Sequence, residues 1–420
     1  MTTEVPVQTP MPAARGTRVD LACRLGQAVS TVSRLTGRGA GGVIGGRAIL
    51  RLAPDATRVL ATGREVLLVS GTNGKTTTSA LLTAALRTGG AVASNTDGAN
   101  TPAGFVTTLA NADADRVVLE TDEGWLPWAA AETGARTAVL LNLTRDQLHR
   151  HHEVRRLAAR WHDATDRLDL VVANADDPDV VWAAEPARRQ VWVAAGMHWK
   201  QDSVICPRCG DRQLWVGDTW GCDCGLRRPT PDWWLEDGDL VSATARVRLD
   251  LALPGEVNRG NAALAVAAAV AHGIEPQAAA DAMREVAAVI GRYDVVEHAG
   301  RQARLVLAKN PASWLEAIDL VGRSPAPLVL AFNSEGVDGR DPSWLYDVPL
   351  DQLTGRGILV VGRRVTDMIV RLEMAGIDDV RARPTLRAAL ESLPLGPVDV
   401  IANYTAFQEA RKELSGGRRR

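Results

Sequence analysis

The sequence predicts an α/β protein with two sheet-containing domains and a small cysteine-rich insert. From residue 64, short β-branched runs alternate with helical segments, which is the pattern of a parallel sheet that helices cover on both faces. The alternation stops between residues 198 and 235, where cysteines, glycines and tryptophans gather. A second alternating series begins after about residue 297 and is long enough for a separate Rossmann-like C-terminal domain.

Chain length agrees with more than one domain. The 420 residues exceed the roughly 100 to 200 residues of a single domain. Apolar residues at helical spacing predict a helix over residues 21–35, ahead of a glycine-rich run at 37–42 that lacks the preceding strand of a dinucleotide-binding loop. We expect an N-terminal tail and helical segment at 1–55, a central domain at 56–295 carrying the insert at 198–235, and a C-terminal domain at 296–420.

Charge and hydropathy exclude several classes of protein. The chain has 48 basic and 50 acidic side chains, so no global field points to nucleic acid or to an anionic membrane. The first twenty residues lack the apolar stretch of a secretory signal, and no later run reaches the roughly 18 apolar residues of a membrane helix. We therefore expect a cytoplasmic protein.

Strands and helices are predicted from hydrophobic runs and their periodicity. Strand-containing segments of the central domain are residues 65–74, 116–123, 137–144 and 168–177, with helices at 76–86 and 261–271. Those of the C-terminal domain are residues 304–311, 327–332, 357–362 and 398–403.

A glycine-containing loop follows the strand at residues 66–69 and leads into a helix. Glycines let backbone N–H groups surround phosphate oxygens, and the helix directs its positive end at them. Lys75 would reach the terminal phosphates, and the Thr76 hydroxyl would bind Mg²⁺. The predicted ATP phosphate site comprises Gly71, Thr72, Asn73, Gly74, Lys75, Thr76 and Thr77.

Four of the five cysteines fall within nineteen positions, which suits a metal site in a reducing compartment. Cys206 and Cys209 form a Cys-x-x-Cys-Gly knuckle, and Cys222 and Cys224 supply a second, shorter pair. Four thiolates around Zn²⁺ leave no open position, so we predict a structural zinc ribbon. The flanking tryptophans are expected to cover this small unit, and they are Trp199, Trp215, Trp220, Trp233 and Trp234.

Further motifs resemble those of the Mur ligase family and occur in the family's order. Gly71 and Gly74 have the short spacing of that family's phosphate loop. Glu120, at the end of a strand, occupies the position of the family's Mg²⁺-binding glutamate, and Asn142 follows the next strand. The remaining matches are Asn258 and Asn261 of the LPG-x-x-N-x-x-N sequence near the nucleotide, Gly291-Arg292 near the ribose and phosphates, and Lys309-Asn310-Pro311 in place of His-Asn-Pro.

In three features the chain departs from the wider family and resembles the MurT branch of that family. The chain reaches its phosphate loop by residue 71, which leaves no room for the domain that holds a uridine-diphosphate substrate in the amino-acid-adding ligases. It also carries the four-cysteine insert and the Lys-Asn-Pro sequence. This resemblance covers about residues 40–415 and implies an ATP-dependent carbon–nitrogen ligase of peptidoglycan synthesis.

The MurT resemblance also implies a reaction and a partner. ATP would phosphorylate the D-glutamate α-carboxylate of the lipid II stem peptide, and ammonia would displace the phosphate to give D-isoglutamine. Lys75 and Glu120 are the implied catalytic residues beside the phosphates, and Mg²⁺ would be held by Thr76 and Glu120, with Arg292 near the phosphates. Because the sequence contains no glutaminase domain, a GatD-like glutamine amidotransferase subunit is expected to supply ammonia at the inner face of the membrane.

A carboxylate near the ammonia entry would help ammonium to lose its proton. The segment at 332–347 resembles the MurT stretch that contains an essential aspartate, and we favour Asp347, then Asp341, then Asp338. Residues 95–101 are expected to face the substrate, unless they form only a turn-rich connection.

Two rival functions remain open at this stage. One is a ligase like folylpolyglutamate synthase or cyanophycin synthetase, which adds an amino acid instead of ammonia. The other is a non-catalytic nucleotide-binding scaffold. The sequence also leaves open the choice among lipid II, lipid I and a soluble precursor, the ammonia route, the stoichiometry, and the role of a cluster comprising His149, His151 and His152.

Overall fold

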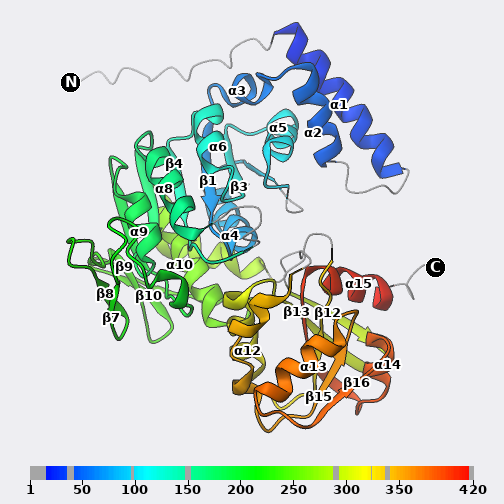
Figure 1. Ribbon diagram of the computed structural model, residues 1–420. Coiled ribbons are helices and arrows are strands. Elements are labelled where there is room, and N and C mark those ends of the chain that lie inside the picture. The colour runs from blue at the N-terminus through cyan, green and yellow to red at the C-terminus, as the bar shows by residue number, and fades with distance from the viewer. Residues whose placement is uncertain are drawn as a thin grey trace, which may run out of the picture.

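The computed structural model describes residues 16–35, 42–95, 99–146, 153–286, 293–322, 324–335 and 341–415. Figure 1 shows a helical N-terminal region, a central α/β domain with the cysteine-rich insert at its side, and a C-terminal α/β domain. The predicted fold class, two sheet-containing domains with an insert, is confirmed. Among the described residues, no helix combines the length and the apolar character needed to cross a membrane.

Helix α1 (Thr17–Leu35) contains the predicted N-terminal helix and lies at the outer edge of the molecule (Figure 1). The glycine-rich run leads into α2 (Gly42–Leu52), which sequence patterns did not reveal, and a short α3 (Ala56–Ala61) follows. A Cβ at Gly45 would overlap the Ser30 hydroxyl of α1, and one at Gly46 would overlap the Ala103 carbonyl of α5. These glycines therefore let α2 approach both neighbouring helices at backbone distance.

In the described part of the chain, nine strands form the central sheet in the order β11-β10-β9-β6-β5-β4-β1-β3-β2. The strands from β2 to β9 run parallel, whereas β10 and β11 are antiparallel at one edge. The bounds are β1 Glu65–Ser70, β2 Val92–Ser94, β3 Arg116–Thr121, β4 Thr137–Leu140, β5 Leu170–Asn174, β6 Gln190–Ala194, β9 Trp233–Glu236, β10 Asp239–Ser242 and β11 Arg246–Arg248.

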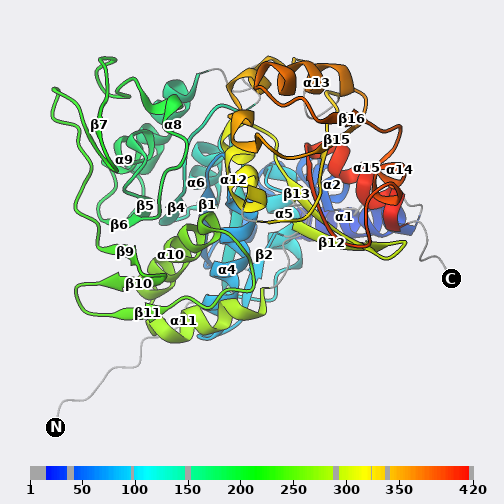
Figure 2. The same cartoon turned by 90° about the horizontal axis from the view of Figure 1, so that it is seen from below.

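Helices cover both faces of this sheet, as the buried strands require. Alternate side chains of β1 enter two cores, with Val66 and Leu68 on one face and Leu67 and Val69 on the other. Figure 2 shows α4, α10 and α11 together on one side of the strands. The helices are α4 Lys75–Arg87, α5 Pro102–Asn111, α6 Leu126–Thr133, α8 Val154–Thr165, α9 Pro178–Ala184, α10 Glu256–Ala271 and α11 Pro276–Ala282, followed by the 3-10 turn η2 Met283–Glu285.

The insert connects β6 to β9 and contains η1 (Gln201–Ser203) and the hairpin of β7 (Leu214–Val216) and β8 (Thr219–Gly221). Trp220 is buried beside Cys206, and Trp215 packs against the same cluster, as expected. Trp233 and Trp234 instead belong to β9 of the central sheet, and Trp233 is buried in its core. The expectation that all five tryptophans cover the insert was therefore wrong for this pair.

The C-terminal sheet has the order β12-β13-β17-β14-β15-β16, with β12 alone antiparallel to its neighbour. All four predicted strands are present, but the edge strands β12 and β16 were missed. Strand bounds are β12 Tyr293–His298, β13 Arg301–Leu307, β14 Leu328–Ala331, β15 Ile358–Val361, β16 Val380–Ala382 and β17 Gly396–Ala402. The helices are α12 Pro311–Gly322, η4 Ser343–Asp347, η5 Leu350–Leu353, α13 Val365–Met374, α14 Leu386–Glu391 and α15 Tyr404–Ser415.

Candidate active site

The predicted phosphate loop connects β1 to α4, as the sequence indicated. Gly74 has a φ of +82°, and a Cβ there would lie 2.5 Å from the Asn261 side-chain oxygen of α10. At Gly71 a Cβ would lie 2.8 Å from the Cβ of Leu141. Both glycines are therefore required by close packing, and Gly74 is required by its backbone conformation as well.

Asn142 fixes the backbone of this loop. Its side-chain oxygen accepts the Asn73 N–H at 2.9 Å, and its side-chain nitrogen donates to the Asn73 carbonyl at 3.1 Å. The Thr72 hydroxyl accepts a hydrogen bond from the backbone N–H of Thr144 at 3.0 Å. The segment after β4 thus holds the loop in shape before any nucleotide binds.

Lys75 lies beneath the loop with its side chain only 4% exposed. Its ammonium donates to the Gly71 carbonyl at 2.5 Å, to the Thr72 carbonyl at 3.2 Å and to the Glu123 carboxylate at 2.7 Å. Burial lowers the pKa of Lys75, but Glu123 outweighs that effect, and the net shift is upward. Lys75 is therefore held as a cation at the place where phosphate charge would collect.

Glu123 was missed by sequence reasoning. Burial raises its pKa, but the charges of Lys75 and Lys309 and the hydrogen bond from Lys75 lower it to about 2. The available signal was its position in the loop after β3, three residues beyond Glu120. Sequence spacing alone does not tell whether Glu120 or Glu123 forms the ion pair with Lys75.

Glu120 lies at the carboxyl end of β3, paired in register with Val69 of β1, and is almost fully buried. Its carboxylate accepts a hydrogen bond from the Asn100 side chain at 3.2 Å. Asn95 makes two hydrogen bonds to the Glu120 backbone, at 2.7 and 2.8 Å. The predicted 95–101 segment therefore braces Glu120, while its residues 96–98 lie outside the described residues.

The donor set here suits Mg²⁺. Glu120 offers a buried carboxylate oxygen, and Thr76, in the first turn of α4, offers a hydroxyl. Such hard oxygen ligands are those that Mg²⁺ prefers. Both assignments stay predictions.

A cavity of about 480 Å³ opens beside the phosphate loop, between the central and C-terminal domains. That volume lies within the range of small-ligand pockets. Its polar lining includes Asn258 and Asn261, which are joined by a 3.3 Å hydrogen bond. Arg292, predicted near the nucleotide, lies outside the described residues. Other lining residues are Asn73, Gly74, Thr77, Asn142, His198, Pro254, Tyr293, Ser313 and Glu316.

The Lys-Asn-Pro segment of the C-terminal domain contacts the phosphate loop directly. Asn310 and Asn73 form a reciprocal pair of side-chain amide hydrogen bonds at 3.2 and 3.3 Å. Lys309 donates to the Thr72 carbonyl at 3.3 Å and forms an ion pair with Asp146 of the central domain. Two residues that the C-terminal domain supplies thus contact the phosphate loop and the segment after β4.

Asp347, at the end of η4, faces the central domain. Its carboxylate lies 3.1 Å from the Arg145 guanidinium, which also contacts the buried carboxylate of Asp202 at 2.5 Å. Asp202 accepts two further hydrogen bonds at 2.8 Å, from the Arg145 backbone N–H and from the Trp199 ring. The residues Arg145 and Asp202 were missed because their contact spans the base of the insert.

The other two aspartate candidates behave differently. Asp341 accepts the Ser343 N–H at 2.9 Å, and this backbone hydrogen bond lowers the pKa of Asp341. That is the geometry of a turn-forming aspartate. Asp338 lies outside the described residues, as do His149, His151 and His152. Asp347 remains the candidate with a contact to the phosphate-loop side of the site.

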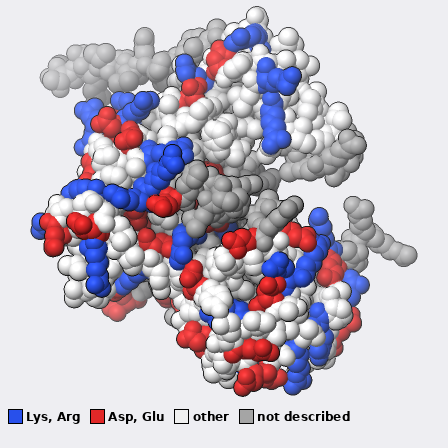
Figure 3. Space-filling model, viewed as in Figure 1, with Lys and Arg blue, Asp and Glu red and all other residues white. Residues whose placement is uncertain are grey.

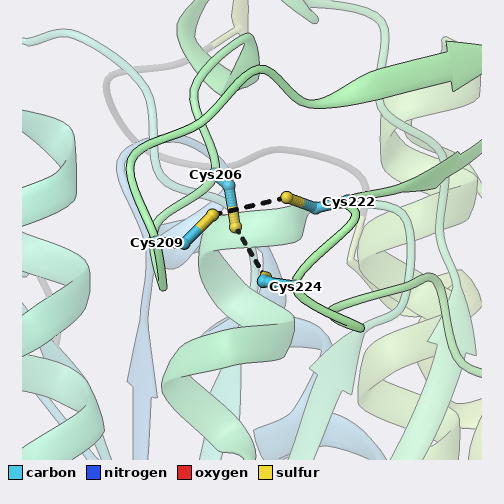
Figure 4. A group of neighbouring side chains, drawn as sticks. All are labelled: Cys206, Cys209, Cys222 and Cys224. Atoms are coloured by element: carbon cyan, nitrogen blue, oxygen red, sulfur yellow. Dashed lines mark hydrogen bonds between the residues drawn. The ribbon is translucent and has the colours of Figure 1, made fainter.

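The four cysteines of the insert converge on one point, with all four sulfur atoms within 4.8 Å of one another (Figure 4). Cys206 and Cys224 lie 3.6 Å apart, and Cys209 and Cys222 lie 3.4 Å apart. A tetrahedron with Zn–S bonds of about 2.3 Å has sulfur atoms about 3.8 Å apart. The Leu226 backbone N–H lowers the pKa of Cys224 to about 7, whereas burial raises the pKa of Cys206, so Cys224 is the readier thiolate of the two.

Both knuckles turn through glycines with positive φ, +85° at Gly210 and +90° at Gly225. The shorter Cys222-Cys224 pair therefore reaches the same point as the longer pair. The arrangement fits a closed structural zinc site, which remains a prediction for the metal itself.

Comparisons with known proteins follow this division of the chain. The Mur ligase middle domain family matches residues 69–204, and the MurT ligase C-terminal family matches residues 307–407. Acinetobacter baumannii MurF has a TM-score of 0.63 at 16% identity, covering 88% of this chain and 80% of its own. A Thermotoga maritima folylpolyglutamate synthase has a TM-score of 0.60 at 14% identity, covering 93% and 98%. At these identities the structural likeness concerns the fold alone.

The fold, the phosphate loop and these matches define the class: the chain is an ATP-dependent ligase of the Mur ligase family. Within that family it belongs to the MurT group. A Streptococcus pneumoniae relative is 28% identical over 90% of this chain and 93% of its own length. A Staphylococcus aureus relative is 25% identical over 94% and 97%. Both relatives are named lipid II isoglutaminyl synthase (glutamine-hydrolyzing) subunit MurT.

Proposed function

We propose that this chain amidates the D-glutamate α-carboxylate of the lipid II stem peptide, using ATP and ammonia from a glutaminase partner subunit. The observation that carries the proposal is the ion pair between Asp347 and Arg145. This pair lies on the side of the C-terminal domain that meets the phosphate loop. The names of the two MurT relatives mention lipid II, which supports this substrate, and call each protein a subunit, which supports a partner. The alignments cover nearly the whole length of both relatives, which supports assigning the activity in their names to this chain.

The first step is phosphoryl transfer. ATP occupies the cavity beside the phosphate loop, with its phosphates on the backbone of residues 71–77 and its nucleoside near Asn258 and Asn261. A substrate carboxylate oxygen attacks the γ-phosphorus, so the bond to ADP breaks and an acyl phosphate forms. Lys75 stabilises the charge on the transferring group, because its buried ammonium has little competing water.

Thr76 and Glu120 would hold Mg²⁺ in this site. The bound ion would neutralise phosphate charge during the transfer. Asn95 and Asn100 keep the Glu120 backbone and carboxylate in place, so the ligand is positioned before the nucleotide arrives.

The second step is attack by ammonia on the acyl carbon. A C–N bond forms, the C–O bond to phosphate breaks, and inorganic phosphate leaves. Asp347 accepts the proton that ammonium or the attacking nitrogen must lose. Arg145 contacts the same carboxylate and fixes its direction.

The nitrogen source is a separate subunit of the GatD-like glutamine amidotransferase type. Its support is the subunit wording of both relatives, together with the absence of a glutaminase signature in the sequence. Because lipid II is membrane-borne, we place the complex at the inner face of the cell membrane.

The Asp347→Asn variant tests this assignment when ammonium chloride replaces the partner. Wild type should release ADP and amidate lipid II with ammonium alone, while the variant should retain ATP binding and lose amidation. Asp341→Asn is the matched control, since that side chain only caps a turn. Full amidation by Asp347→Asn would remove Asp347 from the mechanism, and activity with an amino acid but not with ammonium would favour a folylpolyglutamate-synthase-like ligase.

A further inference from the structure

The outward face of α1 carries several large apolar side chains. Leu21 and Val32 are each 59% exposed and Leu25 is 46% exposed. Spacings of four and seven residues place these side chains on one side of the helix. In a surface helix of a globular protein the large apolar side chains normally face the core. We call this feature the α1 stripe, which consists of Leu21, Leu25, Val29 and Val32.

The inward face of α1 buries Val19 together with smaller side chains. Ala22, Cys23 and Ser33 are buried there, and a Cβ at Gly26 would overlap Ile49 of α2. Packing between α1 and α2 is therefore satisfied without the α1 stripe. Removing the exposed side chains of the stripe should therefore leave the fold intact.

Charge distinguishes this end of the molecule from the rest. Residues 16–52 contain six arginines, one aspartate, and no lysine or glutamate. The whole chain carries a formal net charge of −2, so the remainder is acidic. Arg24 of α1 and Arg47 and Arg51 of α2 are exposed. In Figure 3 the α1–α2 region is mostly white surface interrupted by blue side chains.

We infer that the α1 stripe docks the enzyme on an anionic lipid bilayer. An exposed apolar helix face beside arginines is the composition of an interfacial membrane helix, which buries its apolar side chains among the headgroups. Arginines near an anionic surface strengthen such binding. The acidic remainder of the chain is repelled by the same surface, so only this end approaches it.

The position of the stripe suits a membrane-borne substrate, and in this respect the inference rests on the proposed function. Helix α2 contacts α5 at backbone distance through Gly46. Asn100, just before α5, contacts the Glu120 carboxylate. A bilayer bound at α1 therefore lies two helices away from the loop that braces the predicted Mg²⁺ ligand.

Vesicle flotation of the full chain tests the inference. Vesicles of phosphatidylcholine with phosphatidylglycerol should carry wild type upward, and vesicles of phosphatidylcholine alone should carry far less. Leu21→Gln with Leu25→Gln should lower partitioning at least tenfold, by loss of buried apolar surface. Arg24→Gln should lower it roughly fivefold on anionic vesicles and little on neutral ones.

The matched control is Val370→Gln with Leu395→Gln, which removes two exposed apolar side chains from the C-terminal domain. This control should float as wild type does, and circular dichroism should show unchanged helix content in both double variants. The inference would be overturned if wild type does not rise with the anionic vesicles. It would also be overturned if a stripe variant rises as well as wild type does. Loss of amidotransferase co-purification in a stripe variant, without any vesicle binding by wild type, would assign the stripe to a protein partner instead.

A second readout separates this inference from the proposed function. The vesicles contain no lipid-linked substrate, so flotation does not depend on catalysis. Stripe variants should amidate a soluble muropeptide fragment at the wild-type rate and lose activity only on vesicle-borne lipid II. If wild type floats but amidates neither substrate, the docking surface stands and the proposed function fails.

Discussion

Arg145 of the central domain and Asp347 of the C-terminal domain form an ion pair, with 3.1 Å between their nearest nitrogen and oxygen atoms. Asp202, at the base of the cysteine-rich insert, forms a second ion pair with the same arginine. The insert, the phosphate-loop domain and the proposed catalytic aspartate are thus connected through one guanidinium. A planar guanidinium can bind two carboxylates at once in fixed directions, which lysine does not reproduce.

Replacing Arg145 by Ala should lower kcat for amidation by about tenfold to a hundredfold, because Asp347 loses its orientation. The KM for ATP should change little, since Arg145 is not among the residues lining the cavity proposed for the nucleotide. Arg136→Ala is the control, as it breaks a surface ion pair with Asp169. Equal kcat values for the two variants would show that the Arg145 contact has no part in the reaction.

Gly74→Ala should weaken ATP binding by more than tenfold. The added Cβ would lie 2.5 Å from the Asn261 side chain in a backbone conformation with φ of +82°. Gly63→Ala is a close control, because Gly63 has a φ of +78° and no atom within 4 Å of the added Cβ. Both variants should lose about 1 kcal/mol of stability from the left-handed backbone conformation alone. Titration of a fluorescent ATP analogue separates them, and equal affinities would contradict the assigned loop.

Glu123→Gln should reduce the free energy of unfolding by about 3 kcal/mol at pH 7, because the Glu123 pKa falls from its usual value near 4.3 to about 2 on folding. A depressed carboxylate pKa stabilises the folded state above the unfolded pKa and loses that effect as pH falls toward 2. The difference between wild type and variant should therefore shrink between about pH 4.3 and 2.

Urea unfolding across this pH range measures that difference. Glu185→Gln is the control, since Glu185 forms an ion pair with Arg208 at the surface and should cost less than about 1 kcal/mol. A Glu123→Gln variant as stable as wild type at pH 7 would mean that the buried pair with Lys75 contributes nothing.

The purified chain should contain one zinc per molecule under reducing conditions. Cys224→Ser should lose the metal and lower the thermal stability of the insert, since the small ribbon has few other buried side chains. Cys23→Ser should keep the metal, because that thiol is buried on α1 far along the chain from the cluster. Elemental analysis of the three proteins decides the point, and zinc-free wild type would refute the assignment.

The sequence predicted those parts of the site in which local pattern and chemistry coincide. A strand, glycines and a lysine occur together in residues 66–77, and the four thiols follow a metal-binding spacing. Strands buried on both faces, such as β1 and β5, were found because continuous apolar runs mark them. The exposed edge strand β12, in contrast, has little hydrophobic pattern to detect.

Contacts between distant segments were beyond sequence reasoning. The pair of Asn73 and Asn310 depends on how two domains dock, and that of Arg145 and Asp202 depends on the path of the insert. Helix α2 was missed because glycines normally weaken helices, whereas here close packing against α1 and α5 overrides that propensity. Tertiary contacts of this kind leave no periodic trace in the sequence.

The central claim is tested most directly by incubating the chain and its amidotransferase partner with ATP, lipid II and glutamine carrying an isotopically labelled amide nitrogen. Tandem mass spectrometry of the product should place the label in an amide at the D-glutamate α-carboxyl, with one ADP formed per amide. Omitting ATP or the chain should abolish the label. An unlabelled stem peptide alongside glutamine hydrolysis and ATP turnover, or a product extended by a whole amino acid, would contradict the account.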